Sequence, residues 1–334
     1  MSPAATKITV ITQEGPFYRG HSVIALAEKA TLEEVAALIW EVDESDVFPH
    51  QLPEVPANFD AIRAALTSLS PFDQAGSLLP LLEASNARTY DFSNLGYAKT
   101  GAYLLRWLVA LVIGADRPSI DPIHVTLARG LNAPEGYEDI IRRALVLTAD
   151  HELAPSSYAV RAVANTGCTP CQAVLTGLAA ARGRRVLTGR IPAVRRLIDE
   201  LLDSDNPEEV ILERFREGEA LPGFADMIYR GEDARAGSLL DALSRQFGSD
   251  KAVEHMLRGV EVARREFGLE ADVILPLTFL ERQLRRRHRD LALSPLARIV
   301  GWIAHAIEQM GSGPIVRPRT IYTGLLPTGA PARR

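Results

Sequence analysis

One cluster of polar side chains stands where chemistry could be done. Asp150, His151 and Glu152 place an imidazole between two carboxylates. One helical pattern ends just before them, and Pro155 opens another just after. Binding and catalytic residues concentrate at such junctions, because a rigid scaffold positions side chains that the connecting segment leaves accessible. We therefore expect a functional site around residues 150–152.

The two cysteines form a second candidate group. Cys168 and Cys171 have the spacing of a redox motif or of half a zinc site, but a four-thiolate zinc site would need four cysteines in the chain. Thr169, Pro170 and Gln172 also fit a capping box with proline at the first helical position. The capping interpretation explains the spacing without redox chemistry, and we prefer it.

A basic run over Arg282–Arg289 is the third candidate. The chain has 37 Lys plus Arg against 42 Asp plus Glu, a formal charge of −5. This balance disfavours nucleic acid and anionic membrane surfaces as partners. We interpret the run as the solvated face of a helix.

Helix signals dominate the elements that must position these residues. Thr31 and Glu34 have the capping-box form ahead of an apolar stripe, and Asn206-Pro207 opens another helix. Ser294-Pro295 repeats this device for a core helix that ends near Gly311. Only Lys7–Thr12 shows weak strand alternation. The chain is predicted to be mainly α.

Length and composition set further bounds. A chain of 334 residues predicts about two domains, and 47% hydrophobic with 24% charged residues is typical of globular proteins. The most apolar stretch, Trp107–Ala115, is too short to span a membrane. Two cysteines and no signal-peptide pattern favour a cytoplasmic protein.

Several segments together resemble the citrate synthase family. Residues 148–153 are similar to the family's His-x-Asp-His-Glu segment, and residues 223–235 align without a gap to its Gly-Phe-Gly-His-Arg-Val-Tyr-Lys-x-x-Asp-Pro-Arg loop. Residues 270–272 stand where the family has Asn-Val-Asp. The opening at 18–36 and the C-terminal stretches 297–305 and 317–324 also match.

The resemblance implies a two-domain helical fold. It comprises a large, dimer-forming domain over residues 1–188 and 277–334 and a small domain inserted over residues 189–276. In the family, the cleft between the domains closes on a 2-oxo dicarboxylate and then on an acyl-CoA.

The family's condensation needs three acting groups. Asp272 matches the aspartate that takes a proton from the thioester methyl. The enol histidine lies in a Pro-Leu-His-Gly-Gly turn, where residues 186–190 place Thr188, or Val186 under another alignment. The ketone-polarising histidine falls on Asp226, which would face an anion unless it held a proton. The resemblance therefore implies a site without either catalytic histidine.

The groups that bind carboxylates in the family are retained by resemblance. They are His151, Arg235, Arg298 and Arg317, and in the family the last reaches into the neighbouring subunit's cleft. Guanidinium groups grip carboxylates through paired, charge-assisted hydrogen bonds. Coenzyme binding is implied at Leu221, Pro222, Gly223 and Phe224, with Arg230 near a CoA phosphate.

Simpler interpretations remain open beside these. Asp272 fits a helix-start residue, His151 fits a structural histidine, and the three arginines fit ion-paired surface residues. Their joint match to one family pattern makes us prefer a pocket.

The sequence thus predicts a protein that binds a citrate-type carboxylate, and with it CoA or a CoA thioester as co-substrate, with no permanently bound cofactor or metal. We expect a pseudoenzyme or regulatory subunit, as a homodimer or as a heteromer with an active citrate synthase paralogue. One alternative is an active acyltransferase that condenses an acyl-CoA with an oxo acid through a rebuilt site. Another is a dimeric scaffold without a small-molecule ligand.

Overall fold

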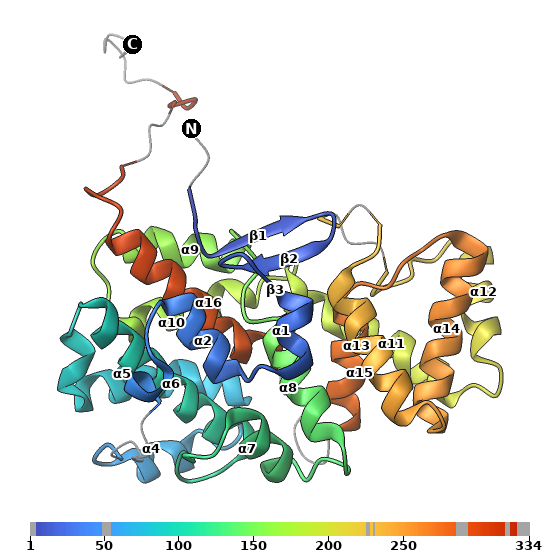
Figure 1. The fold of residues 1–334 in the computed structure, drawn as a ribbon, viewed down its shortest axis with the longest axis horizontal. Coiled ribbons are helices and arrows are strands. Elements are labelled where there is room, and N and C mark those ends of the chain that lie inside the picture. The colour runs from blue at the N-terminus through green and yellow to red at the C-terminus, as the bar shows by residue number, and fades with distance from the viewer. Residues whose placement is uncertain are drawn as a thin grey trace.

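Helices make up most of the molecule, as predicted (Figure 1). The computed structural model describes residues 5–48, 55–224, 228–229, 231–284, 293–317 and 321–325, with the backbone alone at 187 and 188. Within this part, no helix is both long and apolar enough to cross a membrane.

A small antiparallel sheet lies near the N-terminus, in the order β1-β2-β3. Its strands are β1 (Thr9–Thr12), β2 (Gly15–Tyr18) and β3 (His21–Ser22). β1 pairs with β2 so that Thr9 faces Tyr18 and Thr12 faces Gly15. The strand expected within Lys7–Thr12 is thus confirmed at Thr9–Thr12.

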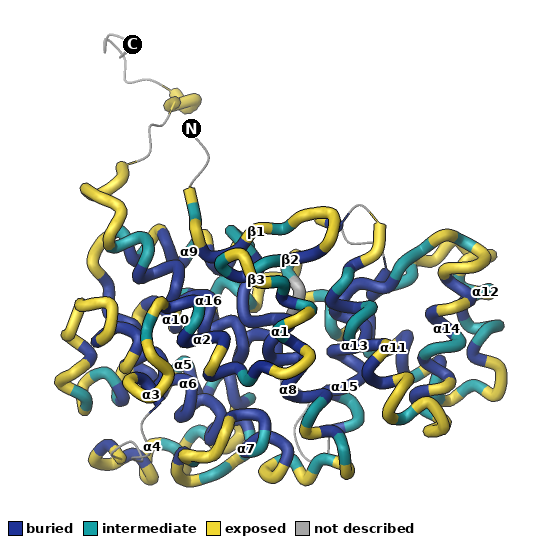
Figure 2. The backbone as a smooth tube through the Cα atoms, in the orientation of Figure 1, coloured by how far each residue is buried: buried dark blue, intermediate teal, exposed yellow. Residues whose placement is uncertain are grey.

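The larger group of helices surrounds one buried helix, α16 (Leu293–Met310), which packs against α2, α6, α8, α9 and α10. Trp302 and Ile303 on α16 are fully buried. Figure 2 shows mostly buried backbone along α16 and the helices beside it. The other helices of this group are α1 (Val23–Lys29), α2 (Leu32–Trp40), α3 (Glu44–Val47), α4 (Phe59–Ala65), α5 (Pro71–Ser85), the 3₁₀ turn η1 (Ala87–Tyr90), α6 (Asn94–Ile113), α7 (Ile123–Gly130), α8 (Tyr137–Leu147), α9 (Pro155–Ala164) and α10 (Pro170–Ala181).

The second group lies at the other end of the long axis (Figure 1). It consists of α11 (Leu187–Asp203), α12 (Pro207–Arg216), α13 (Ala234–Phe247), α14 (Lys251–Phe267) and α15 (Ile274–Gln283). Within it, α11 packs against α15 and α12 against α14, while α13 and α15 also contact α8 of the larger group. The domain boundaries at 188/189 and 276/277 stay a prediction.

The predicted helix starts are confirmed where the signal is local. Thr31 with Glu34 and Thr169 with Gln172 both form capping boxes. α12 begins at Pro207 as expected, although the Asn206 side chain makes no capping hydrogen bond.

The start predicted for the core helix was wrong. α16 begins at Leu293, so Ser294 lies inside the helix rather than capping it. The Leu293 amide donates to Glu281 Oε1 at 2.8 Å, and both residues are buried. A carboxylate from α15 therefore satisfies a free amide at this helix start, which a local reading of the sequence misses.

Only residues 282–284 of the predicted basic helix face are described; Arg282 is partly exposed and Leu284 is buried, so the solvated face stays a prediction. α15 ends at Gln283, and Arg282 donates to Asp199 at 2.6 Å. Residues 285–289 lie outside the described residues.

Candidate active site

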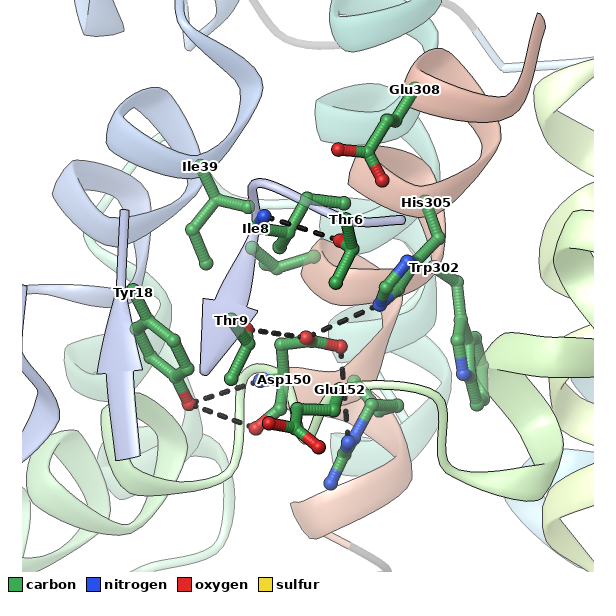
Figure 3. A network of polar contacts seen from close by, with 12 residues as sticks. Thr6, Ile8, Thr9, Tyr18, Ile39, Asp150, Glu152, Trp302, His305 and Glu308 are labelled. Carbon is green, nitrogen blue, oxygen red and sulfur yellow. Dashed lines mark hydrogen bonds and ion pairs between the residues drawn. The ribbon is translucent and has the colours of Figure 1, made fainter. Parts of the chain in front are cut away.

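The segment between α8 and α9 carries the polar cluster that the sequence singled out. Its Asp150 is fully buried and Thr9 Oγ1 donates to Asp150 Oδ2 at 2.6 Å, while His305 Nε2 lies 3.3 Å from the same oxygen. Figure 3 shows Thr9, His305 and Tyr18 converging on this residue from the sheet and from α16. Burial alone would raise the pKa of Asp150, but His305, Arg298 and Thr9 lower it to about 2.

The N-terminal sheet fixes the backbone of the same segment. The Tyr18 hydroxyl donates to the Asp150 carbonyl at 3.2 Å and accepts from the Asp150 amide at 3.0 Å. Glu152 has a φ of +48°, and its carboxylate accepts a hydrogen bond from the Ile11 amide at 2.7 Å. Such a left-handed conformation is uncommon outside glycine, and it persists here because the surrounding contacts fix it.

Arg298, on α16, faces the same carboxylate from the core. Its Nη1 lies 3.9 Å from Asp150 Oδ1, and its side chain is only 9% exposed. Among the described residues, no acceptor is within hydrogen-bond distance of this buried nitrogen. Burial lowers the pKa of Arg298, which the Asp150 charge partly offsets. A buried donor without a hydrogen bond is costly, and an anionic ligand would satisfy it.

His151 lies beside a second buried arginine. Its Nε2 is 3.0 Å from the Tyr229 hydroxyl, and the Arg235 guanidinium lies over the Tyr229 ring at 4.8 Å from the centroid. Burial, together with the charges of Arg235 and Arg298, lowers the pKa of His151 well below its usual value. His151 is therefore neutral at pH 7 and can donate one hydrogen bond without adding charge.

Asp233 connects the Arg235 side chain to the segment that carries Asp272, the predicted base. Arg235 donates to both of its carboxylate oxygens, from Nε at 3.0 Å and from Nη2 at 2.8 Å. The amide of Val273, next to Asp272, donates to Asp233 Oδ2 at 3.1 Å. The Asp233 charge holds the pKa of Arg235 above its usual value despite burial.

Asp272 is 1% exposed and lies just before α15. Its amide donates to the Gly223 carbonyl at 2.8 Å, and the neighbouring Ala271 forms a bridge with Phe224. Its Oδ1 accepts the Ile274 amide at 2.9 Å, so the residue also stabilises the start of α15, as the simpler interpretation expects. Its Oδ2 accepts from Arg190 Nη2 at 2.7 Å.

The loop expected to hold the coenzyme is therefore fixed against the candidate base. Gly223 has a φ of +91°, and a Cβ there would lie 3.1 Å from Leu275 Cβ. Both the backbone conformation and the close approach require glycine at this position. Of the loop Leu221–Phe224, Gly223 thus contacts Asp272 itself and Phe224 contacts the neighbouring Ala271.

The remaining predicted residues lie elsewhere or outside the described residues. Thr188 is in the first turn of α11, but its side chain is outside the described part, as are Asp226 and Arg230. Arg317 is exposed on the C-terminal segment that runs away from the body of the molecule (Figure 1). A single chain therefore brings together His151, Arg235, Arg298 and Asp272 but not Arg317.

Three residues of this network were not assigned roles from the sequence. They are Tyr229, Asp233 and Arg190, whose partners lie far along the chain or depend on the loop conformation. Tyr229 and Asp233 belong to the matched loop, which was the available signal. Arg190 carried no signal, because its partner is 82 residues away.

The cysteines play no part in this site. Both are buried and form no disulfide. Burial raises the pKa of the Cys168 thiol, and it raises the pKa of the Cys171 thiol to about 12. Thiols held protonated in this way are poor nucleophiles and poor metal ligands. The described residues contain no group of three or more His, Cys, Asp or Glu placed to hold a metal ion.

Known proteins match the chain along nearly its whole length. The family profile described as "Citrate synthase, C-terminal domain" matches residues 2–319. Citrate synthase 2 of Bacillus subtilis is 24% identical, covering 96% of this chain and 93% of that protein. The 2-methylcitrate synthase of Shewanella oneidensis is 24% identical, covering 95% and 91%.

A solved structure confirms the fold. It is the ternary complex of citrate synthase from Thermoplasma acidophilum with carboxymethyl coenzyme A and oxaloacetate. That structure superposes with a TM-score of 0.76 at 20% identity, covering 98% of this chain and 95% of that one. The expected citrate-synthase-like helical fold is thus confirmed, and the chain belongs to the citrate synthase family.

Proposed function

We propose that this protein binds a 2-oxo dicarboxylate or citrate-type anion between His151, Arg235 and Arg298. The observation that carries the proposal is Arg298 Nη1, a buried cationic donor with no acceptor among the described residues. Arg235 already donates from Nε and Nη2 to Asp233, so it adds orientation and positive potential more than open donors. A carboxylate ligand would satisfy Arg298 with charge-assisted hydrogen bonds.

The same proposal holds condensation to be impaired, as in a pseudoenzyme or a regulatory subunit. By resemblance, Thr188 and Asp226 stand where the family has its two acting histidines. Each such group contributes roughly 10²- to 10⁴-fold to a rate, so losing two costs several orders of magnitude even with Asp272 in place. The Thermoplasma relative binds oxaloacetate together with a coenzyme A analogue. We extend this pairing to the present chain, with CoA at Leu221–Phe224 and Arg230.

The proposal includes a dimer and a closing cleft. Residues 1–188 and 277–334 form the large domain and residues 189–276 the small one, so that closure brings Asp272 toward the bound anion. In the assembly, the partner's Arg317 completes the cleft. The partner is a second copy or a histidine-intact paralogue, and copurification of such a paralogue from native cells would identify the latter.

Isothermal titration calorimetry with oxaloacetate and citrate tests the binding claim. Charge-assisted hydrogen bonds are worth about 1.5–3 kcal/mol, so Arg298→Gln should weaken binding by roughly 10- to 100-fold. Arg196→Gln, an exposed change on α11, serves as the matched control and should bind like the wild type. If neither anion gives a binding heat or a thermal stabilisation of the protein, the proposal is contradicted and a scaffold without a ligand is favoured.

The second candidate function is an active acyltransferase that condenses an acyl-CoA with an oxo acid. The observation in its favour is Asp272, which is retained, buried and held against the loop of residues 221–224. This candidate requires oxaloacetate-dependent turnover that Asp272→Ala removes.

A further inference from the structure

Arg190 makes a contact that the family resemblance does not explain. It lies in the first turn of α11, and its Nη2 donates to Asp272 Oδ2 at 2.7 Å. The Arg190 side chain is 35% exposed, whereas the Asp272 side chain is 1% exposed. The guanidinium therefore covers a buried carboxylate from the accessible side.

This contact occupies one oxygen of the carboxylate that the reaction would use. Asp272 Oδ1 already accepts the Ile274 amide at 2.9 Å and helps to start α15. Arg190 donates to the other carboxylate oxygen, Oδ2. An adjacent opposite charge stabilises the ionised carboxylate and weakens it as a base. The strength of a general base depends on how readily it takes a proton, so the pairing opposes proton abstraction.

By resemblance, in the alignment that places Thr188 at the histidine, the arginine stands where the family turn has glycine. In the Pro-Leu-His-Gly-Gly alignment, Arg190 takes the second glycine, a residue without a side chain to reach Asp272. Gly189 packs so closely on the backbone of Arg184 that a Cβ would lie 2.6 Å from it. This approach fixes the start of α11 and, with it, the position from which Arg190 reaches Asp272.

We infer that Arg190 is a lock on Asp272: by pairing with the carboxylate, it suppresses proton abstraction from an acyl-CoA bound in the cleft. Arg190 acts through Asp272 and is thus a positioning residue. The inference rests on the proposed function in one respect, namely that an acyl-CoA enters beside Asp272.

The suppressed step is proton exchange at the thioester. Asp272 takes a proton from the carbon next to the thioester carbonyl, and the electron pair of that C–H bond moves into the enolate. In D₂O the protonated carboxyl exchanges with solvent and returns a deuteron to the carbon. The step consumes no other reactant, and NMR of acetyl-CoA in D₂O follows it without any condensation.

Arg190→Gln is the decisive variant. We expect it to raise deuterium exchange into acetyl-CoA by about tenfold or more over the wild type. Arg190→Lys keeps a positive charge and should stay slow, and Arg196→Gln should match the wild type. The double variant Arg190→Gln/Asp272→Ala should lose the gain, because the gain passes through Asp272. Exchange that falls in Arg190→Gln would overturn the inference and make Arg190 a stabiliser of the enolate.

A second readout does not depend on acyl-CoA. Carboxyl ¹³C NMR identifies the Asp272 resonance as the signal missing from Asp272→Ala, and in Arg190→Gln this signal should titrate at higher pH. An unchanged titration with unchanged exchange overturns the lock. If the Asp272 titration shifts but deuterium exchange is no faster, the pairing of Arg190 with Asp272 is supported. The same result contradicts the entry of an acyl-CoA beside Asp272. Oxaloacetate calorimetry on the same variants reports separately on the anion site.

Discussion

Asp150 organises the charges around the proposed anion site. It is fully buried between Arg298, His305 and Thr9, and their combined effect lowers its pKa to about 2 from an ordinary 3.8. Because the folded pKa lies below the unfolded one, the carboxylate stabilises the fold above about pH 4. This contribution is lost as pH falls from about 4 toward 2.

Replacing Asp150 should therefore destabilise the protein in a pH-dependent way. Asp150→Asn leaves the buried Arg298 guanidinium without its counter-charge, and we expect a loss of about 3 kcal/mol in the free energy of unfolding at pH 7. Urea unfolding at several pH values measures this. The difference in the free energy of unfolding between wild type and variant should become smaller as pH falls from 4 to 2. A constant difference over that interval would contradict the assigned pKa.

At the residue scale, the sequence provides candidate site residues but not their contacts, and the site itself stays a prediction. The matched motifs identified His151, Arg235, Arg298 and Asp272, which the fold brings into one connected region. The Arg190–Asp272 pair was not predictable, because no local pattern specifies a contact between residues 82 apart.

The same limit holds for secondary-structure elements. Capping boxes involve residues three apart, so Thr31 and Thr169 were predicted correctly. The starts of α7 and α16 instead involve carboxylates from other helices. Glu33 accepts the Ile123 amide at 2.7 Å, and Glu281 accepts that of Leu293. Only the tertiary fold reveals such contacts.

Glu33 provides a test of such a contact. Burial raises the pKa of this carboxyl above its ordinary 4.5, an effect that the hydrogen bond from Ile123 opposes. Because the folded pKa is the higher one, stability is lost as pH rises through it. Glu33→Gln keeps an acceptor for the Ile123 amide and removes the charge, so its stability relative to wild type should increase from pH 5 to pH 8.

Thermal unfolding at both pH values measures this difference. Glu33→Ala, which removes the acceptor as well as the charge, should be about 1 kcal/mol less stable than Glu33→Gln at either pH. A Glu33→Gln variant that becomes relatively less stable with rising pH would refute the assigned direction.

The packing of α10 on α16 depends on the absence of one side chain. A Cβ on Gly177 would lie 2.3 Å from the buried Trp302 ring. Gly177→Ala should therefore destabilise the fold by about 1–3 kcal/mol. On α5, Gly76 has only Leu175 Cδ1 at 3.9 Å, so Gly76→Ala should be neutral or slightly stabilising. Equal effects in chemical denaturation would argue against this close packing.

At the scale of the whole molecule, residues 315–317 of the C-terminal segment lie exposed, without another surface of the described chain covering them. Ile315 and Val316 are 73% and 66% exposed, and Arg317 beside them is exposed too. Apolar side chains on an extended segment are stabilised when another surface covers them. This agrees with our proposal that the C-terminal segment binds a partner subunit.

If the partner's Arg317 completes each cleft, Arg317→Gln should weaken oxaloacetate binding by about tenfold despite its exposure in the single chain. Arg216→Gln, another exposed arginine, should bind normally. Calorimetry with light scattering on the same samples would separate loss of the ligand contact from loss of the dimer. Unchanged affinity in an intact dimer would exclude Arg317 from the site.

The overall fold was predictable because family motifs spread over the chain define it together. The finer question, whether a chain with this fold still condenses its substrates, depends on a few side chains at the cleft. In our proposal, Arg190 and Asp272 form one such pair, and the positions of the two acting histidines are others.

The most direct test of this account is the loss of thioester absorbance when the purified protein is mixed with oxaloacetate and acetyl- or propionyl-CoA. Asp272→Ala is the control. We predict no turnover above that control at concentrations where calorimetry shows oxaloacetate bound. Oxaloacetate-dependent turnover that Asp272→Ala abolishes would contradict the account and establish an enzyme with a rebuilt site.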